Sequence, residues 1–224
     1  SAGSIRAAYP DGVRDLADGG CWDLIAGQLT DDSELALMLA RSLVREGRFA
    51  PDPVAAAYVA WLESHPFDIG NTTRQALAAG THATGQGASV AEACRAAANP
   101  GSQANGALMR VSPLGIYGWS MPPTDVDRLA RIDAALTHPH PVCQDTSALF
   151  AATLGHAIRE GTDARATFAF AREHARMHVE SASVRDALSA ASDRPPADFL
   201  SQQGWVLIAL QNAFYQLLHA PNLE

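Results

Sequence analysis

The chain has 224 residues, of which 47% are hydrophobic and 18% are charged. A chain of this length buries about 70% of its unfolded surface, so it can build a full core without disulfides or structural metals. Its formal net charge of -8 argues against binding to nucleic acid or an anionic membrane through bulk charge, but it does not exclude a small phosphate-bearing ligand.

Cysteine usage and hydropathy indicate the cellular compartment. The three cysteines, Cys21, Cys94 and Cys143, are widely separated, which fits a reducing compartment better than a disulfide framework. No apolar run reaches the roughly 18 residues that a membrane span needs, and no basic-then-apolar leader is present. We therefore expect a soluble, cytoplasmic protein that does not engage membranes.

Residues 1–28 show no regular periodicity and carry turn signals at Tyr9-Pro10-Asp11-Gly12 and Gly19-Gly20. A structureless stretch of this length is unusual at the start of a domain. We expect an irregular segment that either wraps around the core or follows an element that has been removed.

Residues 29–34, Leu-Thr-Asp-Asp-Ser-Glu, carry three carboxylates and two hydroxyls and lead into an apolar helical pattern. We predict this helix over Asp31 to Glu46, with Gly47 at its end. Asp, Ser and Thr can cap a helix start by accepting bonds from unpaired backbone N–H groups. Capping needs one side-chain oxygen, however, and Mg²⁺ or Mn²⁺ binds carboxylate, hydroxyl and water oxygens. A capped helix and a cation site are both compatible with this stretch.

The rest of the chain predicts helices and no strand, because no stretch alternates with period two over β-branched residues. Glycine-rich segments at Gly80–Gly87 and Asn99–Gly118 are expected to be loops. Helix caps are predicted at Ser89, at Thr124 or Asp125, at Asp145 or Thr146, and at Thr162 or Asp163. We predict an all-α single globular domain over residues 1–224 with about nine helices, the further ones near 51–65, 71–77, 89–97, 124–136, 145–160, 162–178, 181–191 and 201–218.

The loop from Phe67 to Thr73 has the composition of a ligand-binding loop. Asp68 and Asn71 flank a glycine, which lets the backbone approach a ligand closely. Asn71 or Thr72 can equally cap the helix that follows.

The loop from Gly101 to Gly106 is a second candidate. Its backbone amides and Ser102 can cradle a phosphate, although the loop contains neither a Walker motif nor Gly-x-Gly-x-x-Gly. The neighbouring Arg110 can bind phosphate or extend its charged end into solvent.

A third polar segment, Thr137 to Cys143, presents two histidines and a cysteine, His138, His140 and Cys143. These are donor types that zinc accepts, but no fourth ligand has a suitable spacing. A structural loop, or a loop that lines a ligand pocket, is the favoured interpretation. The sequence also lacks the Gly-x-Ser-x-Gly elbow of serine hydrolases.

Taken in order, these segments resemble the ADP-ribosylglycohydrolase family, which includes the dinitrogenase-reductase-activating glycohydrolase. The matching segments span about 190 residues: 29–34, 67–73, 101–114, 137–140 and the apolar helix from Gly204-Trp205. The resemblance implies an orthogonally packed all-α fold with a dinuclear Mg²⁺ or Mn²⁺ centre. It also implies hydrolysis of the glycosidic bond between ADP-ribose and a modified residue, often arginine.

The resemblance assigns roles to individual positions. Asp31, Asp32 and Asp68 are the implied catalytic carboxylates, with Asp68 orienting or deprotonating water. Thr30 joins these three as a metal ligand. The implied substrate-binding residues are Asn71, Gly101, Ser102, Asn105, Gly106, His138 or His140 or both, and Trp205, whose ring can stack on the ligand.

This sequence departs from the family pattern at both ends. Family members begin with a helix that carries Gly-Asp-Ala-x-Gly and end with an Asp-x-Asp-Thr metal motif, and neither occurs here. We therefore expect a domain trimmed at both ends. Its expected partner is ADP-ribose or an ADP-ribosylated protein, and its expected state is a monomer. The alternatives are a pseudo-enzyme that binds ADP-ribose or a nucleotide without hydrolysis, and a purely structural helical domain.

Overall fold

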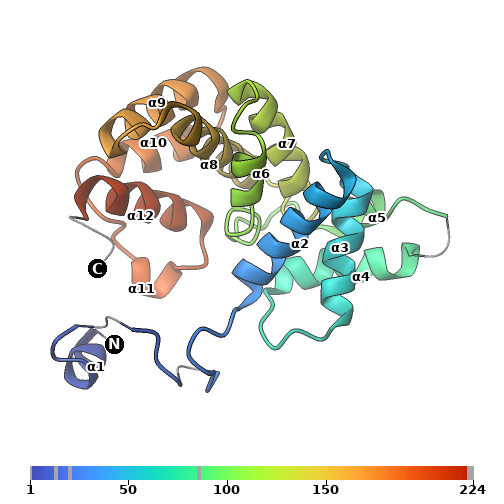
Figure 1. The fold of residues 1–224 in the computed structure, drawn as a ribbon, viewed down its shortest axis with the longest axis horizontal. Coiled ribbons are helices and arrows are strands. Elements are labelled where there is room, and N and C mark those ends of the chain that lie inside the picture. Colours follow the sequence, from blue (N-terminus) through green and yellow to red (C-terminus); the bar gives the residue numbers. More distant parts are fainter. Residues whose placement is uncertain (1, 13–14, 20–21, 85–86, 221–224) are drawn as a thin grey trace.

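The computed structural model describes residues 2–12, 15–19, 22–84 and 87–220. The regular elements in these ranges are all helices, which confirms the predicted all-α class (Figure 1). Their β-structure is confined to two isolated bridges, Gly19 with Leu24 and Ala104 with Trp205. The helices are α1 (Ala2–Ala8), α2 (Asp31–Glu46), α3 (Pro51–Glu63), α4 (Asn71–Ala83), α5 (Val90–Ala97), α6 (Ser112–Tyr117), α7 (Pro123–Ala135), α8 (Pro141–Glu160), α9 (Ala164–His178), α10 (Ala182–Ala190), α11 (Phe199–Gln202) and α12 (Val206–His219).

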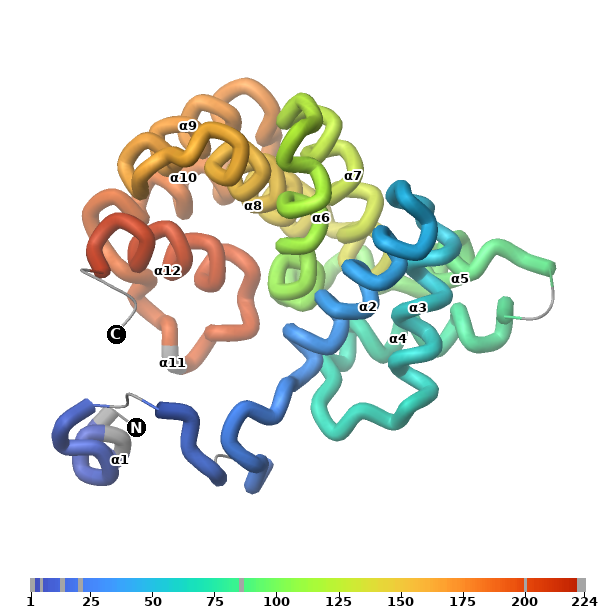
Figure 2. Tube along the Cα trace, in the orientation of Figure 1, coloured from blue at the N-terminus to red at the C-terminus, as the bar shows by residue number. Residues whose placement is uncertain are grey.

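The helices form two groups joined through α6 and α7. Helices α2 to α5 pack on one another, and α8, α9, α10 and α12 form the second group. Helix α6 contacts both α2 and α8, while α7 lies along α8. The tube in Figure 2 shows the two groups on opposite sides of α6, with α1 well away from both.

The first group is held together by a stripe of leucines on α2. Leu35, Leu39 and Leu43 recur every four residues and are almost fully buried, as expected for one face of an amphipathic helix. They belong to the same apolar cluster as Val54 and Tyr58 of α3. The helix has the predicted limits, and Gly47 ends it in the left-handed conformation with φ 63°.

Helix α4 continues beyond the predicted limit at Leu77, through Gly80 and on to Ala83. A Cβ atom at Gly80 would lie 2.6 Å from Cys94 Sγ and 2.7 Å from a methyl group of Val59. The glycine therefore permits close packing of α4 on α3 and α5, and its interpretation as a loop residue was wrong. Residues 85–86 of the expected loop lie outside the described ranges.

Another helix start differs from its prediction because the expected residue has tertiary partners. Helix α8 begins at Pro141, with His140 Nδ1 accepting a bond from the Val142 amide at 3.2 Å. Asp145 does not cap it, since its carboxylate binds Arg131 at 2.6 Å and the Ser181 amide at 2.8 Å. The caps predicted at Ser89 and Asp163 are confirmed, with side-chain bonds to the third residue beyond each.

The start of the chain is more regular than predicted. Residues 2–8 form α1, although residues 1–28 were expected to be irregular. Cys21 and Gly20 lie outside the described ranges. No helix in the described part of the chain is both long enough and apolar enough to span a membrane.

Candidate functional site

The start of α2 is not organised as an ordinary capped helix. Thr30 occupies the N-cap position, but its side chain accepts no bond from the helix. Its hydroxyl instead donates to Asp32 Oδ2 at 3.3 Å, and Asp31 Oδ1 accepts from the neighbouring Asp32 amide at 3.1 Å. Thr30 therefore does not cap the helix through its side chain, while Asp31 accepts from one of the first backbone N–H groups.

Asp31 is a buried carboxylate, with 9% of its surface exposed. Burial, followed by the negative charges of Asp32 and Asp68, raises the pKa of Asp31 to about 6. These three side chains make no ion pair with an arginine or lysine of the described residues. The cluster is therefore a concentration of uncompensated negative charge, which a cation would relieve.

The donor set of these residues meets the requirements of a divalent cation only in part. Carboxylates and a hydroxyl are the ligand types that Mg²⁺ and Mn²⁺ prefer, so the chemistry of Thr30, Asp31, Asp32 and Asp68 fits. Their number does not complete a two-metal centre, because no group of three or more His, Cys, Asp or Glu side chains in the described ranges is arranged to hold a metal. The expected dinuclear ligand set is thus only partly supplied by the residues that the structure describes.

The loop before α4 contributes neutral donors. Helix α4 begins at Asn71, its N-cap is Gly70, and no side chain caps it. The alternative that Asn71 or Thr72 caps this helix was therefore wrong. Thr72 instead bonds Ser102 Oγ at 2.8 Å, which joins this loop to the loop of residues 101–106.

The loop of residues 101–106 is held in place by the chain that precedes α12. The Asn105 amide donates to Gly204 O at 2.9 Å, and the Val206 amide donates to Gln103 O at 3.0 Å. Trp205 Nε1 adds a bond to Gln103 Oε1 at 3.0 Å. This pairing explains why the predicted helix over 201–218 is interrupted at Gln203 to Trp205, between α11 and α12.

Several backbone amides of this loop already have partners within the protein. The Gly101 amide donates to Asn99 Oδ1 at 2.9 Å and the Ser102 amide donates to Asn99 O at 3.3 Å. The Ala104 amide faces Ser102 Oγ at 3.4 Å. These amides are therefore not free to bind a phosphate. The side chains of the loop remain the candidates for ligand contact.

A small cavity of about 80 Å³ lies where these segments meet. Five residues selected from the sequence line it together: Asp31, Asn71, Asn105, Gly106 and His138. The lining also includes Gly70, Thr72, Thr73, Ala104 and Met109, which belong to the same candidate segments but were not selected individually. Typical ligand pockets measure about 300–1,000 Å³, so a ligand as large as ADP-ribose would extend beyond the cavity over its open edge.

The other selected residues lie around this cavity and do not line it. Ser102 touches the lining residue Thr72, and the Asp68 charge acts on Asp31. His140 Nε2 lies 3.3 Å from Gln103 Nε2, and Trp205 is 38% exposed. The remaining selected residues outside the lining are Thr30, Asp32 and Gly101.

The zinc interpretation of the histidine loop finds no support in the described residues. His140 caps α8 through Nδ1, and the buried Cys143 thiol lies near the carbonyl oxygens of Ser102 and Ala104. His138 faces Gly106, where an added Cβ would lie 2.8 Å from the His138 ring. The loop is therefore structural and also supplies one ring to the cavity.

Arg110 differs from both of its predicted roles. It is fully buried, so it neither reaches solvent nor offers its charge to a phosphate. Its guanidinium pairs with Asp133 at 3.2 Å. Nothing in the sequence linked these two residues, which lie 23 positions apart.

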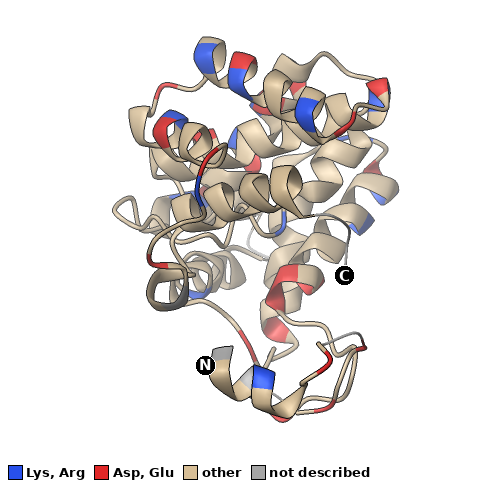
Figure 3. Cartoon of the chain, turned by 90° about the vertical axis from the view of Figure 1, so that its left-hand side faces the viewer, with Lys and Arg blue, Asp and Glu red and all other residues tan. Residues whose placement is uncertain are grey.

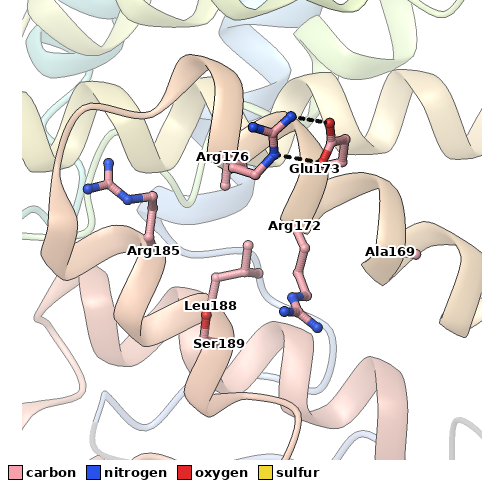
Figure 4. A pocket seen from close by; sticks show the side chains of 8 residues that line it. Ala169, Arg172, Glu173, Arg176, Arg185, Leu188 and Ser189 are labelled. Carbon is pink, nitrogen blue, oxygen red and sulfur yellow. Dashed lines mark hydrogen bonds and ion pairs between the residues drawn. The ribbon is translucent and has the colours of Figure 1, made fainter.

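Larger hollows occur elsewhere, but they contain no selected residue. Figure 4 shows one of about 410 Å³ between α9 and α10, where Arg176 pairs with Glu173, and Arg172 and Leu188 also line the hollow. An apolar groove of about 590 Å³ runs between α2 and α6. In the view of Figure 3, positions of acidic and basic residues are interspersed along the upper helices.

Comparison with known proteins identifies one family. The sequence profile of the ADP-ribosylglycohydrolase family matches residues 1–224. The chain is 32% identical over 157 residues to the ADP-ribosyl-[dinitrogen reductase] glycohydrolase of Rhodospirillum rubrum, covering 70% of this chain and 48% of that protein. It is 35% identical over 112 residues to the ADP-ribosylarginine hydrolase Tri1 of Pseudomonas putida (strain GB-1), covering 47% of this chain and 28% of that protein.

A solved structure described as an ADP-ribosylglycohydrolase-related protein complex has the same fold. It matches with a TM-score of 0.75 and 26% identity, over 94% of this chain and 66% of that chain. The chain spans half the length or less of these curated relatives. Because the family profile covers the whole chain, the chain belongs to the ADP-ribosylglycohydrolase family.

Proposed function

We propose that this protein is a metal-dependent hydrolase that removes ADP-ribose from a modified protein side chain, with the N-glycosidic bond to arginine as the favoured substrate. The observation that carries the proposal is the convergence of Asp31, Asn71, Asn105 and His138 on one cavity. The arginine preference is supported by the relative described as an ADP-ribosylarginine hydrolase.

In this proposal Thr30, Asp31, Asp32 and Asp68 hold Mg²⁺ or Mn²⁺. The bound cation would supply Lewis-acid chemistry, by orienting ribose hydroxyls and activating a water molecule. Asp68 orients the attacking water and accepts its proton. The water oxygen bonds to the anomeric carbon of the ribose, the carbon–nitrogen bond breaks, and the arginine guanidine leaves.

The neutral side chains around the cavity bind the ligand in this scheme. Asn71 and Asn105 hydrogen-bond to ADP-ribose oxygens, and Gly106 lets the ribose approach the backbone closely. Ser102, Gly101 and His140 border the path that the pyrophosphate would follow. Trp205, partly exposed beside this loop, offers an indole face for stacking.

The first test is calorimetric titration of ADP-ribose into the protein, with and without Mn²⁺ and with Mg²⁺ in a parallel series. We expect binding that requires the cation and is lost in Asp31→Asn. Asp125→Asn is the matched control, because the Asp125 side chain on α7 is about half exposed and its ion-pair distance to Arg128 is 3.8 Å. Absence of binding by the unaltered protein under every condition would contradict the proposal.

Hydrolysis is measured separately, as release of ADP-ribose from an ADP-ribosylated arginine peptide. Asp68→Asn should lower the rate by about 10²–10⁴-fold, the usual contribution of a general base. Wild-type turnover in this variant would exclude the role proposed for Asp68.

A second candidate is binding of ADP-ribose without hydrolysis. The observation that favours it is the incomplete metal ligand group in the described ranges. It predicts saturable binding of ADP-ribose with no product release, even at high Mn²⁺ concentration.

The proposed setting is the cytoplasm, and the proposed state is a monomer. The described cysteines, Cys94 and Cys143, are buried and free, as in proteins of reducing compartments. Light scattering during size-exclusion chromatography should give the mass of one chain, and a dimer mass would contradict this part of the proposal.

A further inference from the structure

A fully buried arginine lies beside the candidate cavity and has all its bonds within the protein. Arg110 Nε donates to Asp133 Oδ2 at 3.2 Å and Nη2 donates to Asp133 O at 3.0 Å. Its Nη1 donates to Gly106 O at 3.1 Å and to Thr137 Oγ1 at 2.8 Å. The Tyr58 hydroxyl completes the group by donating to Asp133 Oδ1 at 2.8 Å. Arg110 therefore acts on the cavity only through its neighbours.

The bond from Arg110 determines the direction of the next one. An arginine has no acceptor atom, so the Thr137 hydroxyl oxygen must accept from it. Thr137 is fully buried, and its hydroxyl proton therefore needs an acceptor inside the protein. Among the described residues, the acceptor within hydrogen-bond distance is His138 Nδ1, at 2.8 Å. His138 Nδ1 is consequently the unprotonated nitrogen of the ring.

The ring of His138 is neutral, and its other nitrogen carries the proton. His138 is 1% exposed, and burial together with the nearby charge of Arg110 lowers its pKa to about 3. A neutral imidazole that accepts at Nδ1 has its proton on Nε2. This edge of the ring faces Gly106, where an added Cβ would lie 3.0 Å from Nε2, and both residues line the cavity.

We propose that Arg110 and Thr137 are positioning residues that hold His138 as the Nε2–H tautomer, so that His138 donates a hydrogen bond to an oxygen of ADP-ribose. The group Arg110, Thr137 and His138 is called the relay below. The ligand oxygen belongs to a ribose hydroxyl or to the pyrophosphate, and His138 takes up no proton during the reaction. The donor role rests on the proposed function, whereas the tautomer is a property of the free protein.

The tautomer is measured first, in long-range ¹H–¹⁵N correlation spectra of ¹⁵N-histidine-labelled protein. The chain has eight histidines, and His138→Gln identifies the resonances of His138 by their disappearance. We expect the cross-peak pattern of a single Nε2–H tautomer in the unaltered protein. A pattern of the Nδ1–H tautomer, or of a mixture, would overturn the relay without any need for a variant.

Variants of Thr137 then test how the relay acts. Thr137→Val removes the hydroxyl at constant shape and should abolish the single-tautomer pattern and weaken ADP-ribose binding by about tenfold, the loss of one hydrogen bond. Thr137→Ser keeps a hydroxyl and should restore both properties. Thr146→Val is the matched control, because the buried Thr146 hydroxyl also makes one bond, to Val142 O at 2.6 Å, and should leave both properties unchanged.

The outcomes separate the relay from the proposed function. A Thr137→Val protein that keeps the wild-type tautomer pattern overturns the relay, whatever its affinity. A variant that loses the pattern but binds ADP-ribose normally overturns the donor role of His138. If the unaltered protein does not bind ADP-ribose, the proposed function and the donor role fail together, and the spectra of the free protein still decide the relay.

Discussion

At the scale of single residues, burial shifts the pKa values of two site residues in opposite directions. Asp31 is an acid whose charged form is disfavoured by burial and by neighbouring carboxylates. His138 is a base whose charged form is disfavoured by burial and by Arg110. Burial therefore shifts each pKa towards the neutral form, upwards for the acid and downwards for the base, which is the usual effect of a low-dielectric environment.

The charge on Asp31 should make cation binding pH-dependent. A cation binds the ionised carboxylate, so Asp31 must lose its proton first, and its pKa is raised to about 6. We expect the affinity for Mn²⁺ to be constant above about pH 7 and to fall as the pH drops below about 6. Calorimetric titration of Mn²⁺ at several pH values across this range measures the affinity. An affinity that does not change down to about pH 5 would argue against Asp31 as a ligand.

His138 should weaken the fold in mild acid. Its pKa is about 3 in the folded protein and about 6.5 in an unfolded chain, so the unfolded chain binds more protons between these values. The contribution of His138 to stability is therefore fully present above about pH 6.5 and declines below it, at up to about 1.4 kcal/mol per pH unit. Urea unfolding of wild type and His138→Gln at several pH values isolates this effect, since Asp31 contributes equally to both. The prediction would be contradicted if the free energy of unfolding of the two proteins changed with pH in the same way.

At the scale of secondary structure, the helix limits depend on whether each polar or glycine residue has a tertiary partner. Ser89 caps α5, as its sequence position suggests. Asp145 is an equally suitable residue type for a helix cap. Its carboxylate binds Arg131 instead, and α8 begins four residues earlier, at Pro141. Gly80, a residue that usually interrupts helices, lies inside α4 at a close helix contact.

Gly80→Ala should destabilise the protein although alanine favours helices. The helix preference of alanine gains about 1 kcal/mol over glycine, whereas overpacking of a close contact costs typically about 1–3 kcal/mol. Two of the three close contacts of the added Cβ are shorter than 3 Å, so we expect a net loss of up to about 2 kcal/mol in the free energy of unfolding. Gly204→Ala, where no atom lies within 4 Å, is the control, and a stabilised Gly80→Ala protein would show that α4 can move away.

At the scale of the whole molecule, one buried ion pair connects segments that are distant in the sequence. The Arg110–Asp133 pair joins the turn after the 101–106 loop to α7. The hydrogen bond from Tyr58 to Asp133 connects α3 to the same pair. The guanidinium also stacks 4.5 Å from the centre of the Tyr58 ring. The same group supports Thr137 and His138 at the cavity, so the stability of the core and the geometry of the site depend on common contacts.

Asp133→Asn should therefore destabilise the protein strongly. It leaves the charge of Arg110 buried without a counter-ion, and breaking a buried pair in this way costs about 3–5 kcal/mol. The exposed pair of Asp125 with Arg128 provides the control, since Asp125→Asn should change the stability by less than about 1 kcal/mol. Chemical denaturation measures the free energy of unfolding of both variants. Equal losses in the two variants would show that the buried pair stabilises the protein no more than the exposed pair does.

The sequence alone determined the helical class, most helix positions and the family, because apolar periodicity, capping residues and ordered motifs are local properties. It also selected five residues that line one cavity, Asp31, Asn71, Asn105, Gly106 and His138. Only the tertiary structure decided the partners of Arg110, the interior position of Gly80 and the pairing of Gln103 with Val206. Each of these depends on contacts between residues far apart in the chain, and a buried charge or a missing Cβ leaves no local pattern from which its partner can be read.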